Sequence, residues 1–495
     1  MVRYHSTRDN LNIKTASQAI LQGLSEDGGL FVPDSIPPLP YTISDMTSMS
    51  YQDIAKAVFK EYLSDFTDEE IEYCVDSAYD EKFSDDSIVP LSQVDGDYYM
   101  ELYHGKTMAF KDIALSILPY FMKVSAKKNG IKDEIVILTA TSGDTGKAAL
   151  SGFSDVEGTR IIVFYPKDGV SDIQKDQMIK EPGKNTYVFG IDGNFDEAQS
   201  GVKEIFSDAV LKEKLKKEGF ILSSANSINI GRLLPQIVYY INSYVSLVSF
   251  GRIKDGDEVN VCVPTGNFGN ILASFYAKLM GLPIGKLVVA SNENHVLSDF
   301  FKSGEYDSNR EFLVTNSPSM DILVSSNLER LIFHALLGST SQTKKYMEEL
   351  SSDGKYKLPF LSMDELSDFY ADYATEEETV EVIKDIYERT SYLIDTHTAV
   401  ASKVVRKYKE SHKDDDRVFL IASTASPFKF SDTVSKAIGI KEEECDPYNL
   451  CEKLSSYTHF EVPKPICELK EMKVVHKTTC KKEEMKEVVL NSLIK

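Results

Sequence analysis

Short β-branched runs alternate with longer amphipathic patterns through most of this 495-residue chain. From residue 96 onward, the runs at 97–103, 134–140 and 160–165 are each followed by a stretch with helical periodicity. Strands that are joined by crossover helices pair in parallel and are covered by those helices. The alternation therefore predicts an α/β fold with a twisted, mostly parallel sheet and helices on both of its faces.

A chain of this length exceeds what one hydrophobic core supports, so several packed units are expected. The alternation of strands and helices resumes at 258–263, 286–291 and 417–423, beyond two long helical patterns at 196–218 and 228–249. The acidic N-terminal segment has a mainly helical pattern. We expect an N-terminal accessory unit at 1–95, a first α/β lobe at 96–225, and a second α/β lobe at 226–495 that ends in a peripheral tail.

The charge balance limits the partners of this chain. Its 55 Lys and Arg against 77 Asp and Glu give a net charge of −22, which repels nucleic acids and anionic membranes. A small anionic ligand remains compatible, because a local basic pocket acts at short range. No apolar stretch approaches the roughly 18 residues that cross a bilayer, and the N-terminus lacks a signal-peptide pattern. Six scattered cysteines without a CxxC pair favour a cytoplasmic protein without a metal site.

Lys111 lies in the segment HGKTMAFKDIALSIL, where apolar residues follow the spacing of an amphipathic helix over 110–128. This spacing places Lys111 in the first turn of the helix. The positive end of a helix disfavours an ammonium group, so the amine would lose its proton more easily and attack an aldehyde. On its own, the position is more typical of a solvated surface lysine.

A second segment, EIVILTATSGDTGKAAL, runs from a strand through small residues into a helix. Small residues let backbone amides and hydroxyls converge on an anion at the helix N-terminus. A nucleotide-binding P-loop is excluded, because its glycine spacing is absent and Ala148 follows Lys147 in place of Ser or Thr. The candidate residues are Thr141, Ser142, Gly143, Asp144 and Thr145.

A third segment, EVNVCVPTGNFGNILASF, repeats the order of strand, glycine-rich turn and helix. Its glycines permit close approach of backbone amides to an anion. The GxGxxG spacing of dinucleotide sites is absent, which favours a phosphate monoester, although an ordinary tight turn would have the same sequence. The candidate residues are Gly266, Asn267, Phe268, Gly269 and Asn270.

Two further segments carry polar groups next to apolar elements. Asn226, Asn229 and Arg232 lie at the start of an apolar helix, where planar amides and a guanidinium suit a phosphate or carboxylate. Capping of that helix by Ser227 or Asn226 is the alternative explanation, and both roles are compatible. Ser423 and Thr424 end a strand, and their hydroxyls can hydrogen-bond a ring nitrogen without protonating it. A strand-end turn also accounts for them.

In combination, these segments resemble the threonine synthase family, in the tryptophan-synthase-β-like class of pyridoxal-phosphate enzymes. The resemblance runs from end to end of the chain and keeps the order of the family's motifs. It rests on YHSTRD, SQAILQGLSEDGGLFVP, HGKTMAFKD, TATSGDTGKAA, SSANSINIGR, PTGNFGN, PSMDILVSSNLER, DTHTAVA and STASPFKF.

The resemblance implies a role for each candidate. Lys111 would carry pyridoxal 5′-phosphate as a Schiff base and, once freed by the substrate, would move protons at its carbon atoms. The amides of 266–270 would hold the cofactor phosphate, and Thr424 would face the pyridine nitrogen. Residues 141–145 would hold the substrate carboxylate. The candidates for the substrate phosphate are Asn226, Asn229 and Arg232.

The reaction that the resemblance implies converts O-phospho-L-homoserine and water to L-threonine and phosphate. The sequence does not distinguish between a monomer and a homodimer. Lys106, Asn270 and Ser426 depart from the family's usual HGPT, GNFGD and STAHPAKF. These departures leave two alternatives open. One is a related phospholyase that releases 2-oxobutyrate, and the other is a catalytically silent relative that only binds the cofactor.

Overall fold

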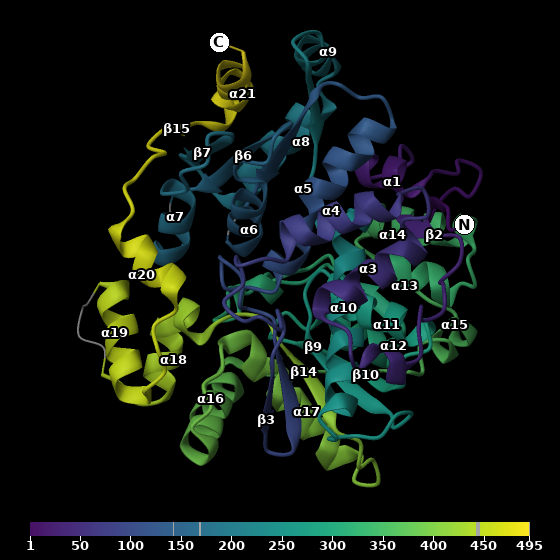
Figure 1. Cartoon of the computed structure of the whole chain (residues 1–495), viewed down its shortest axis with the longest axis vertical. Coiled ribbons are helices and arrows are strands. Elements are labelled where there is room, and N and C mark those ends of the chain that lie inside the picture. The colour runs from purple at the N-terminus through teal and green to yellow at the C-terminus, as the bar shows by residue number, and fades with distance from the viewer. Residues whose placement is uncertain (142, 168–169, 442–445, 495) are drawn as a thin grey trace.

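The computed structural model describes residues 1–141, 143–167, 170–441 and 446–494. Two large sheets form the centres of two lobes, and helices pack on both faces of each sheet (Figure 1). The α/β fold that the alternation of strands and helices predicts is therefore confirmed. In the described ranges, no helix combines the length and apolar character needed to span a membrane.

The first sheet is parallel throughout, with the strand order β15-β7-β6-β5-β8. Its strands are β5 (Glu134–Ala140), β6 (Thr159–Pro166), β7 (Thr186–Ile191), β8 (Phe220–Ser223) and β15 (Thr479–Cys480). Its helices are α5 (Lys111–Lys128), α6 (Asp144–Phe153), α7 (Asp172–Ile179), α8 (Phe195–Ser207) and α9 (Ala209–Lys217). Val136 and Leu138 lie in the core with α8, whereas Ile135 and Ile137 lie in the core with α5 and α6. Both faces of β5 are therefore buried, which explains its continuous apolar sequence.

The second sheet has the order β13-β10-β9-β14-β4-β3, and only its edge pair β3 and β4 is antiparallel. Its strands are β3 (Leu91–Val94), β4 (Asp97–Glu101), β9 (Val259–Pro264), β10 (Ile284–Ser291), β13 (Phe369–Tyr373) and β14 (Phe419–Ser423). Helices α10 (Ile230–Ser249) and α11 (Gly269–Leu279) lie on one side, and α16 (Glu376–Thr390) and α17 (Thr396–Ser411) on the other. Alternate residues of β9 lie on opposite faces of the sheet: Val261 belongs to the hydrophobic core with α10 and α11, and Cys262 to the core with α16 and α17.

The strand pairing crosses the lobe boundaries expected from the sequence. Strand β4 belongs to the segment 96–225 but pairs with β14 in the second sheet. Strand β15 belongs to 226–495 but pairs with β7 in the first sheet, where α21 (Met485–Leu493) buries Met485 and Val489 in the core (Figure 1). The C-terminal segment is thus an edge of the first lobe and not only a peripheral tail, because its apolar residues complete that core.

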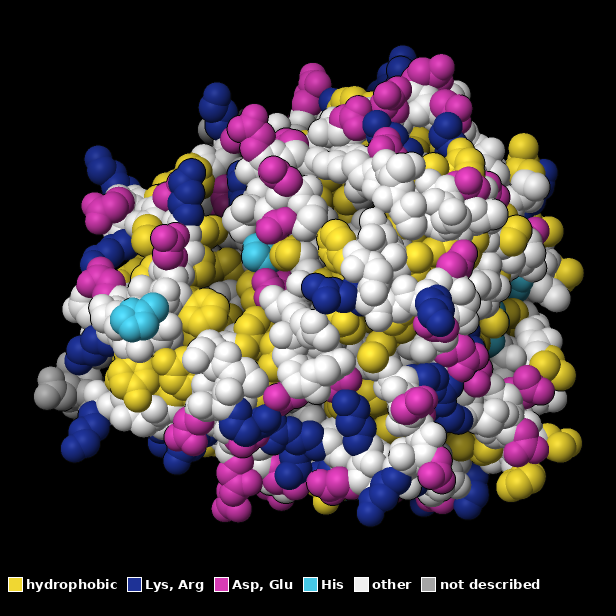
Figure 2. All heavy atoms as spheres, turned by 60° about the horizontal axis from the view of Figure 1, so that its bottom comes forward, with side chains coloured by type: hydrophobic (Ala, Val, Ile, Leu, Met, Phe, Trp, Pro, Cys, Tyr) yellow, Lys and Arg dark blue, Asp and Glu magenta, His cyan; other side chains and the backbone are white. Residues whose placement is uncertain are grey.

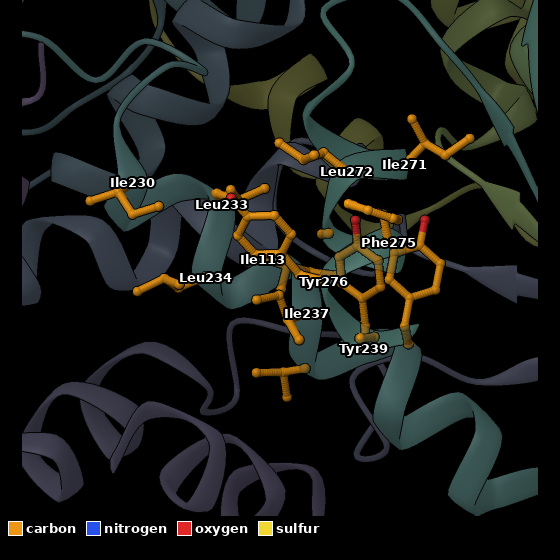
Figure 3. Close-up of a cluster of buried hydrophobic side chains, with 14 of the residues drawn as sticks. Ile113, Ile230, Leu233, Leu234, Ile237, Tyr239, Ile271, Leu272, Phe275 and Tyr276 are labelled. Carbon is orange, nitrogen blue, oxygen red and sulfur yellow. The ribbon is translucent and has the colours of Figure 1, made fainter. Parts of the chain in front are cut away.

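The N-terminal unit contains β1 (Tyr4–Ser6), α1 (Ala16–Gln22), β2 (Phe31–Pro33), α2 (Ile43–Met46), α3 (Tyr51–Tyr62) and α4 (Asp68–Ala78). It shares one hydrophobic core with α5 and α10, where the rings of Phe59 and Phe121 meet edge to face at 5.1 Å. Figure 3 shows the part of this core in which Ile113 of α5 lies near Leu233 and Ile237 of α10. This packing holds the start of α5, and therefore Lys111, in a fixed place.

Two long helical patterns are interrupted in the structure. The pattern at 196–218 breaks at Asp208, whose side chain accepts a hydrogen bond from the Leu211 amide and caps α9. A further helical pattern covers 377–411 and is already interrupted in the sequence by DTHT; in the structure α16 ends at Thr390 and Asp395 caps α17. In both places an aspartate offers the backbone a partner that competes with helix continuation.

The remaining elements connect the sheets. They are α12 (Val296–Ser303), β11 (Glu305–Asp307), η1 (Pro318–Met320), α13 (Leu328–Ala335), α14 (Thr340–Asp353), β12 (Lys355–Lys357), α15 (Phe360–Asp364), η2 (Pro427–Phe430), α18 (Ser431–Ala437), α19 (Pro447–Thr458), α20 (Lys464–Glu471) and η3 (Lys482–Glu484), where η marks a short 3-10 helix.

Figure 2 shows acidic and basic side chains interspersed over one face of the molecule, so the net negative charge does not gather there as a patch of one sign.

Candidate active site

Lys111 is the first residue of α5 and lies beside the carboxyl end of β14. The two segments are joined because the Phe110 amide donates to the carbonyl of Thr424 at 2.9 Å, and Ala109 forms a bridge with Ala425. Thr424 is buried at this junction. The structure thus brings together two candidates that lie 313 positions apart in the sequence, 424 − 111.

The side chain of Lys111 is largely buried, so its amine loses its proton more easily than that of an exposed lysine. Its side chain is 11% exposed, and its Nζ lies 3.7 Å from Oδ2 of Asp144. Burial lowers the pKa of Lys111 to about 8, with Asp144 opposing the shift and the cations Lys429 and Arg232 adding to it. The helix dipole was the cause expected from the sequence, whereas burial is the main cause in the structure. An amine with this pKa is available as a nucleophile and proton carrier near neutral pH.

Asp144 is the centre of a buried cluster of charges. Its Oδ1 accepts from Lys147 Nζ at 2.9 Å and from Gln174 Nε2 at 3.2 Å, and lies 2.8 Å from Lys429 Nζ. The Lys147 and Lys429 side chains are fully buried. The surrounding ammonium groups hold the pKa of Asp144 well below its usual value, although burial alone would raise that pKa. Burial lowers the pKa of Lys147 well below its usual value.

Sequence reasoning missed Lys147 and Lys429 as parts of the site. Both residues lie in segments that carry the family resemblance, Lys147 in TATSGDTGKAA and Lys429 in STASPFKF, but neither was assigned a role. The spacing of Lys147, three residues after Asp144, is that of a helical ion pair. Lys111, Lys147 and Lys429 surround a single carboxylate, so the cluster has more basic groups than acidic ones, which suits an anionic ligand.

The TSGDTG loop is organised by the side chain of Thr141. Its Oγ1 accepts hydrogen bonds from the amides of Gly143 and Gly146, at 3.0 and 3.1 Å. A Cβ at Gly146 would overlap the Thr141 side chain, so the turn requires glycine there. Thr145 is half-buried beside it, and Ser142 lies outside the described residues. This arrangement places the N-terminus of α6, with Asp144 as its first residue, next to Lys111.

Two carbonyl groups of the glycine-rich turn after β9 accept hydrogen bonds from the segment 325–327. The carbonyl of Gly266 accepts from the Ser325 hydroxyl at 2.7 Å, and that of Asn267 accepts from the Asn327 side chain at 2.9 Å. Phe268 has a left-handed backbone with φ of 62°. A Cβ at Gly266 would lie 2.9 Å from the carbonyl oxygen of Ser319, so the turn is tightly backed. The half-buried Gly269 begins α11, whose first amides are free to bind an anion.

The side chain of Asn270 offers a further hydrogen-bond donor for an anion at this turn. Its Oδ1 accepts hydrogen bonds from Tyr239, at 2.6 Å, and from Tyr240. The two tyrosine hydroxyls fix the amide orientation, which leaves Nδ2 as a buried donor with no hydrogen-bond partner among the described residues. Such an orphaned donor is costly unless a ligand accepts from it. The donor set of this turn therefore fits a phosphate group.

The three candidates for the substrate phosphate lie in different surroundings. Arg232 is buried, donates from one terminal nitrogen to the carbonyl of Ala225 at 2.9 Å, and keeps Nε without a partner among the described residues. Burial lowers the pKa of Arg232 to about 10, so it stays charged at neutral pH. Asn229 is fully engaged, because it caps α10 through the Gly231 amide and donates to the carbonyl of Ile20. Asn226 is exposed.

The two other departures from the family motifs lie in different surroundings. Ser426 is buried, and its amide donates to the carbonyl of Met108, next to the loop that leads into Lys111. Lys106 is exposed and lines a separate cavity of about 260 Å³ with Ser116 and Ser151. Ser426 therefore contacts the loop that leads into Lys111, whereas Lys106 lines a cavity that also includes Asp112.

Comparisons with known proteins identify the family of this chain. The family described as "Pyridoxal-phosphate dependent enzyme" matches residues 98–424, and the fold and the site thus define a member of that class. "Threonine synthase N terminus" matches residues 3–79, and "Threonine synthase, C-terminal" matches residues 398–487. The chain belongs to the threonine synthase family of pyridoxal-phosphate-dependent enzymes.

Individual relatives support the assignment. Threonine synthase of Schizosaccharomyces pombe is 37% identical over 88% of this chain and 89% of its own length. The crystal structure of threonine synthase with bound pyridoxal phosphate from Brucella melitensis superposes with a TM-score of 0.89, at 33% identity and full coverage of both chains. "Threonine synthase-like 1" of Pongo abelii is 40% identical over 87% of this chain, and this chain spans 59% of the length of that relative.

Proposed function

We propose that this protein is a pyridoxal-phosphate-dependent lyase that converts O-phospho-L-homoserine and water to L-threonine and phosphate. The observation that carries the proposal is the largely buried Lys111 amine beside Asp144 and its two buried lysines, a cluster that Ser319 links to the glycine-rich turn at 266–270. The family membership supports the same reaction, because the S. pombe and B. melitensis relatives are named threonine synthases.

The cofactor would be held at its three functional groups. The amine of Lys111 binds its aldehyde carbon. The amides of Gly266, Asn267, Phe268, Gly269 and Asn270 and the orphaned Nδ2 of Asn270 bind its phosphate. The hydroxyl of Thr424 faces its ring nitrogen. When bound, pyridoxal phosphate supplies an electron-accepting ring that stabilises negative charge on the substrate carbon next to the amino group.

The substrate would be held at both of its anionic ends. The loop residues Thr141 and Gly143 and the first residues of α6, Asp144 and Thr145, would bind the carboxylate through backbone amides and hydroxyls. The sequence candidate Ser142 belongs to the same segment and lies outside the described residues. The guanidinium of Arg232, with the ammonium groups of Lys147 and Lys429, binds the phosphate. Asn226 is exposed, so it would be the outermost of the residues proposed for the substrate phosphate. Asn229 positions Arg232, whose backbone amide donates to the Asn229 carbonyl at 2.9 Å.

Lys111 would move the protons of the reaction. As a neutral amine, it would accept the protons that the α and β carbons of the substrate lose as phosphate leaves the γ carbon. It would return one proton to the γ carbon and, after water has added its hydroxyl group at the β carbon, one to the α carbon, while the remaining proton of the water passes to the released phosphate. Asp144 Oδ2, at 3.7 Å, stabilises the ammonium form between these transfers. Burial keeps the two protonation states close in free energy near neutral pH, since it lowers the pKa of Lys111 to about 8.

The test combines labelling and product analysis. Borohydride reduction of the protein with pyridoxal phosphate is expected to attach the cofactor to the peptide that contains Lys111, and labelling at another lysine would refute the assignment. Incubation with O-phospho-L-homoserine is then assayed for phosphate, threonine and 2-oxobutyrate. Phosphate and threonine in equal amounts support the proposal. Phosphate with 2-oxobutyrate would identify the phospholyase, and no phosphate would identify a silent relative.

We also propose a cellular location and an assembly state for the enzyme. A cytoplasmic location is supported by the unpaired thiols of Cys74, Cys262, Cys451, Cys467 and Cys480. Its partners are the small-molecule substrate and cofactor, and the assembly is a monomer or homodimer, which sedimentation at micromolar concentration distinguishes.

A further inference from the structure

The short helix η1 lies at the meeting point of the two lobes. The hydroxyl of Ser319 in η1 donates to Oδ2 of Asp144 at 3.2 Å, which joins the second lobe to α6 of the first. The backbone of the same residue packs against Gly266 in the glycine-rich turn. One residue therefore contacts both the charged cluster and the proposed cofactor phosphate site.

Ser319 is held from behind by a buried histidine. Its backbone amide donates to Nε2 of His397 at 3.2 Å. The Nδ1 of His397 lies 2.7 Å from Oδ2 of Asp395, and both side chains are almost completely buried. Because Nε2 must accept from an amide, the hydrogen of the neutral ring lies on Nδ1 and is donated to Asp395.

Asp395 is itself fixed by the fold. It caps α17 by accepting hydrogen bonds from the amides of His397 and Thr398, at 2.9 and 3.1 Å, and from the Thr398 hydroxyl. A continuous chain of hydrogen bonds thus runs from the N-terminus of α17 through His397 and Ser319 to Asp144. The end of this chain is the carboxylate oxygen that also faces Lys111.

The two oxygens of Asp144 have different neighbours. Oδ1 is surrounded by Lys147, Lys429 and Gln174, whereas Oδ2 has the Ser319 hydroxyl at 3.2 Å and the Lys111 ammonium at 3.7 Å. The Ser319 hydroxyl therefore determines where Oδ2 lies relative to Lys111. A shift of Ser319 would change that separation without removing any charge from the cluster.

We infer that His397 is a positioning residue, which places the Ser319 hydroxyl on Asp144 and thereby sets the carboxylate oxygen against Lys111. It acts through Ser319 and touches neither cofactor nor substrate. This role deepens the proposed function and rests on it for its kinetic readout. It also explains why DTHT interrupts the helical pattern at 377–411, since the interruption supplies both Asp395 and His397.

The segment around η1 has a second anchor, which makes the role of His397 specific. Asp321 accepts hydrogen bonds from Asn292 at 2.8 Å, from Asn294 at 2.9 Å and from the Thr315 hydroxyl at 2.8 Å. These bonds do not involve His397. Loss of the His397 ring is therefore expected to displace Ser319 locally while the segment stays docked.

The kinetic test is a double-mutant cycle on His397→Leu and Ser319→Ala with O-phospho-L-homoserine. Each single variant is expected to lower kcat at least about tenfold with less change in KM, because a misplaced group near the reacting atoms lowers the rate more than binding. The double variant should be no slower than the worse single variant, since both act on one contact. Additive effects, or wild-type kcat in His397→Leu, would overturn the inference.

Two further variants separate positioning from general packing. His397→Gln keeps an acceptor for the Ser319 amide and a donor for Asp395, so it should recover part of the lost kcat. Ser402→Ala removes a buried hydroxyl on the same helix, where Ser402 donates to the Thr398 carbonyl and contacts Tyr99, and should keep kcat. A kcat loss in Ser402→Ala as large as that in His397→Leu would show that the effect is only structural.

Hydrogen exchange tests the same contact without an activity readout. His397→Leu should increase deuterium uptake in peptides that cover η1 and the start of α6, and Ser402→Ala should leave both unchanged. Unchanged uptake in His397→Leu would overturn the inference. If the wild-type protein releases no phosphate but the uptake changes as expected, the proposed reaction fails and the positioning contact stands.

Discussion

The amine of Lys111 lies 3.7 Å from Oδ2 of Asp144, and each residue is the first of its helix, α5 and α6. The two helices pack against each other, so the distance between the side chains is set by the core of the first lobe. Asp144 attracts the ammonium form of Lys111, and burial opposes that form. The balance of the two effects decides at which pH the amine can react.

Lys111 in the cofactor-free protein is expected to react with a small amine-directed reagent with a midpoint near pH 8. Burial lowers its pKa to about 8, so the amine is protonated and unreactive below that pH and reactive above it. Exposed lysines titrate near 10.4 and serve as the internal reference. The measurement is mass spectrometry of the labelled peptides across a pH series. A midpoint for Lys111 equal to that of exposed lysines would contradict the burial argument.

Asp144→Asn is expected to destabilise the protein by about 3–5 kcal/mol at pH 7, because it leaves buried lysines without a counter-charge. Denaturant unfolding of the wild type and the variant measures the difference. The double variant Asp144→Asn/Lys147→Met should regain part of the stability, since it also removes one buried amine, but it should not regain activity. Equal stability of wild type and Asp144→Asn would show that the cluster is hydrated and not buried.

The free energies of unfolding of the wild type and Asp144→Asn should differ less at acidic pH than at pH 7. The ammonium groups hold the pKa of Asp144 in the folded protein well below its usual value of about 3.9. Its contribution to stability is therefore complete above pH 4 to 5 and is lost as the pH falls through the folded-state pKa. The stability difference between wild type and Asp144→Asn should shrink on acidification toward pH 3. A difference that grows on acidification would contradict the assignment.

The sequence predicted the fold and the position of Lys111 because both depend on local periodicity. Strand β9 and the glycine turn at 266–270 follow from one continuous segment, and so does the start of α5. The assignments of Asn229 and Arg232 were less complete, because the partners Ile20 and Ala225 are set by tertiary contacts. A cap and a ligand-binding side chain have the same sequence pattern.

The parts of the site that sequence reasoning missed are assembled across long separations. Lys429 reaches Asp144 over 285 positions, 429 − 144, and His397 reaches Ser319 over 78. Buried lysines and histidines also carry no hydropathy signal, since they look like surface residues in the sequence. The crossing of β4 and β15 between lobes was missed for a related reason, because strand order is decided by pairing between distant segments.

Asn270→Ala is expected to weaken cofactor binding about tenfold, because the variant removes a buried side-chain donor of the turn that has no partner among the described residues. It also leaves the hydroxyls of Tyr239 and Tyr240 without their shared acceptor. Titration of cofactor absorbance measures the dissociation constant. Ser274→Ala is the matched control, since Ser274 is buried one turn further along α11 and faces no proposed ligand. An unchanged dissociation constant in Asn270→Ala would remove Asn270 from the cofactor site.

Gly152→Ala is expected to destabilise the protein by about 2–3 kcal/mol, although alanine is the better helix former by roughly 1 kcal/mol. A Cβ at Gly152 of α6 would overlap the carbonyl oxygen of Leu115 in α5, and a backbone atom in a packed helix cannot move aside as a side chain can. Because α5 and α6 carry Lys111 and Asp144, separating them should also lower kcat.

Gly158→Ala is the control for that change. Gly158 has φ of +82°, and a methyl group added there would meet no atom within 4 Å. Only backbone strain of about 1 kcal/mol is therefore expected, with kcat unchanged. Denaturant unfolding and steady-state kinetics of both variants give the comparison. If Gly152→Ala is as stable and as active as Gly158→Ala, then the spacing of the two helices does not control the distance between Lys111 and Asp144.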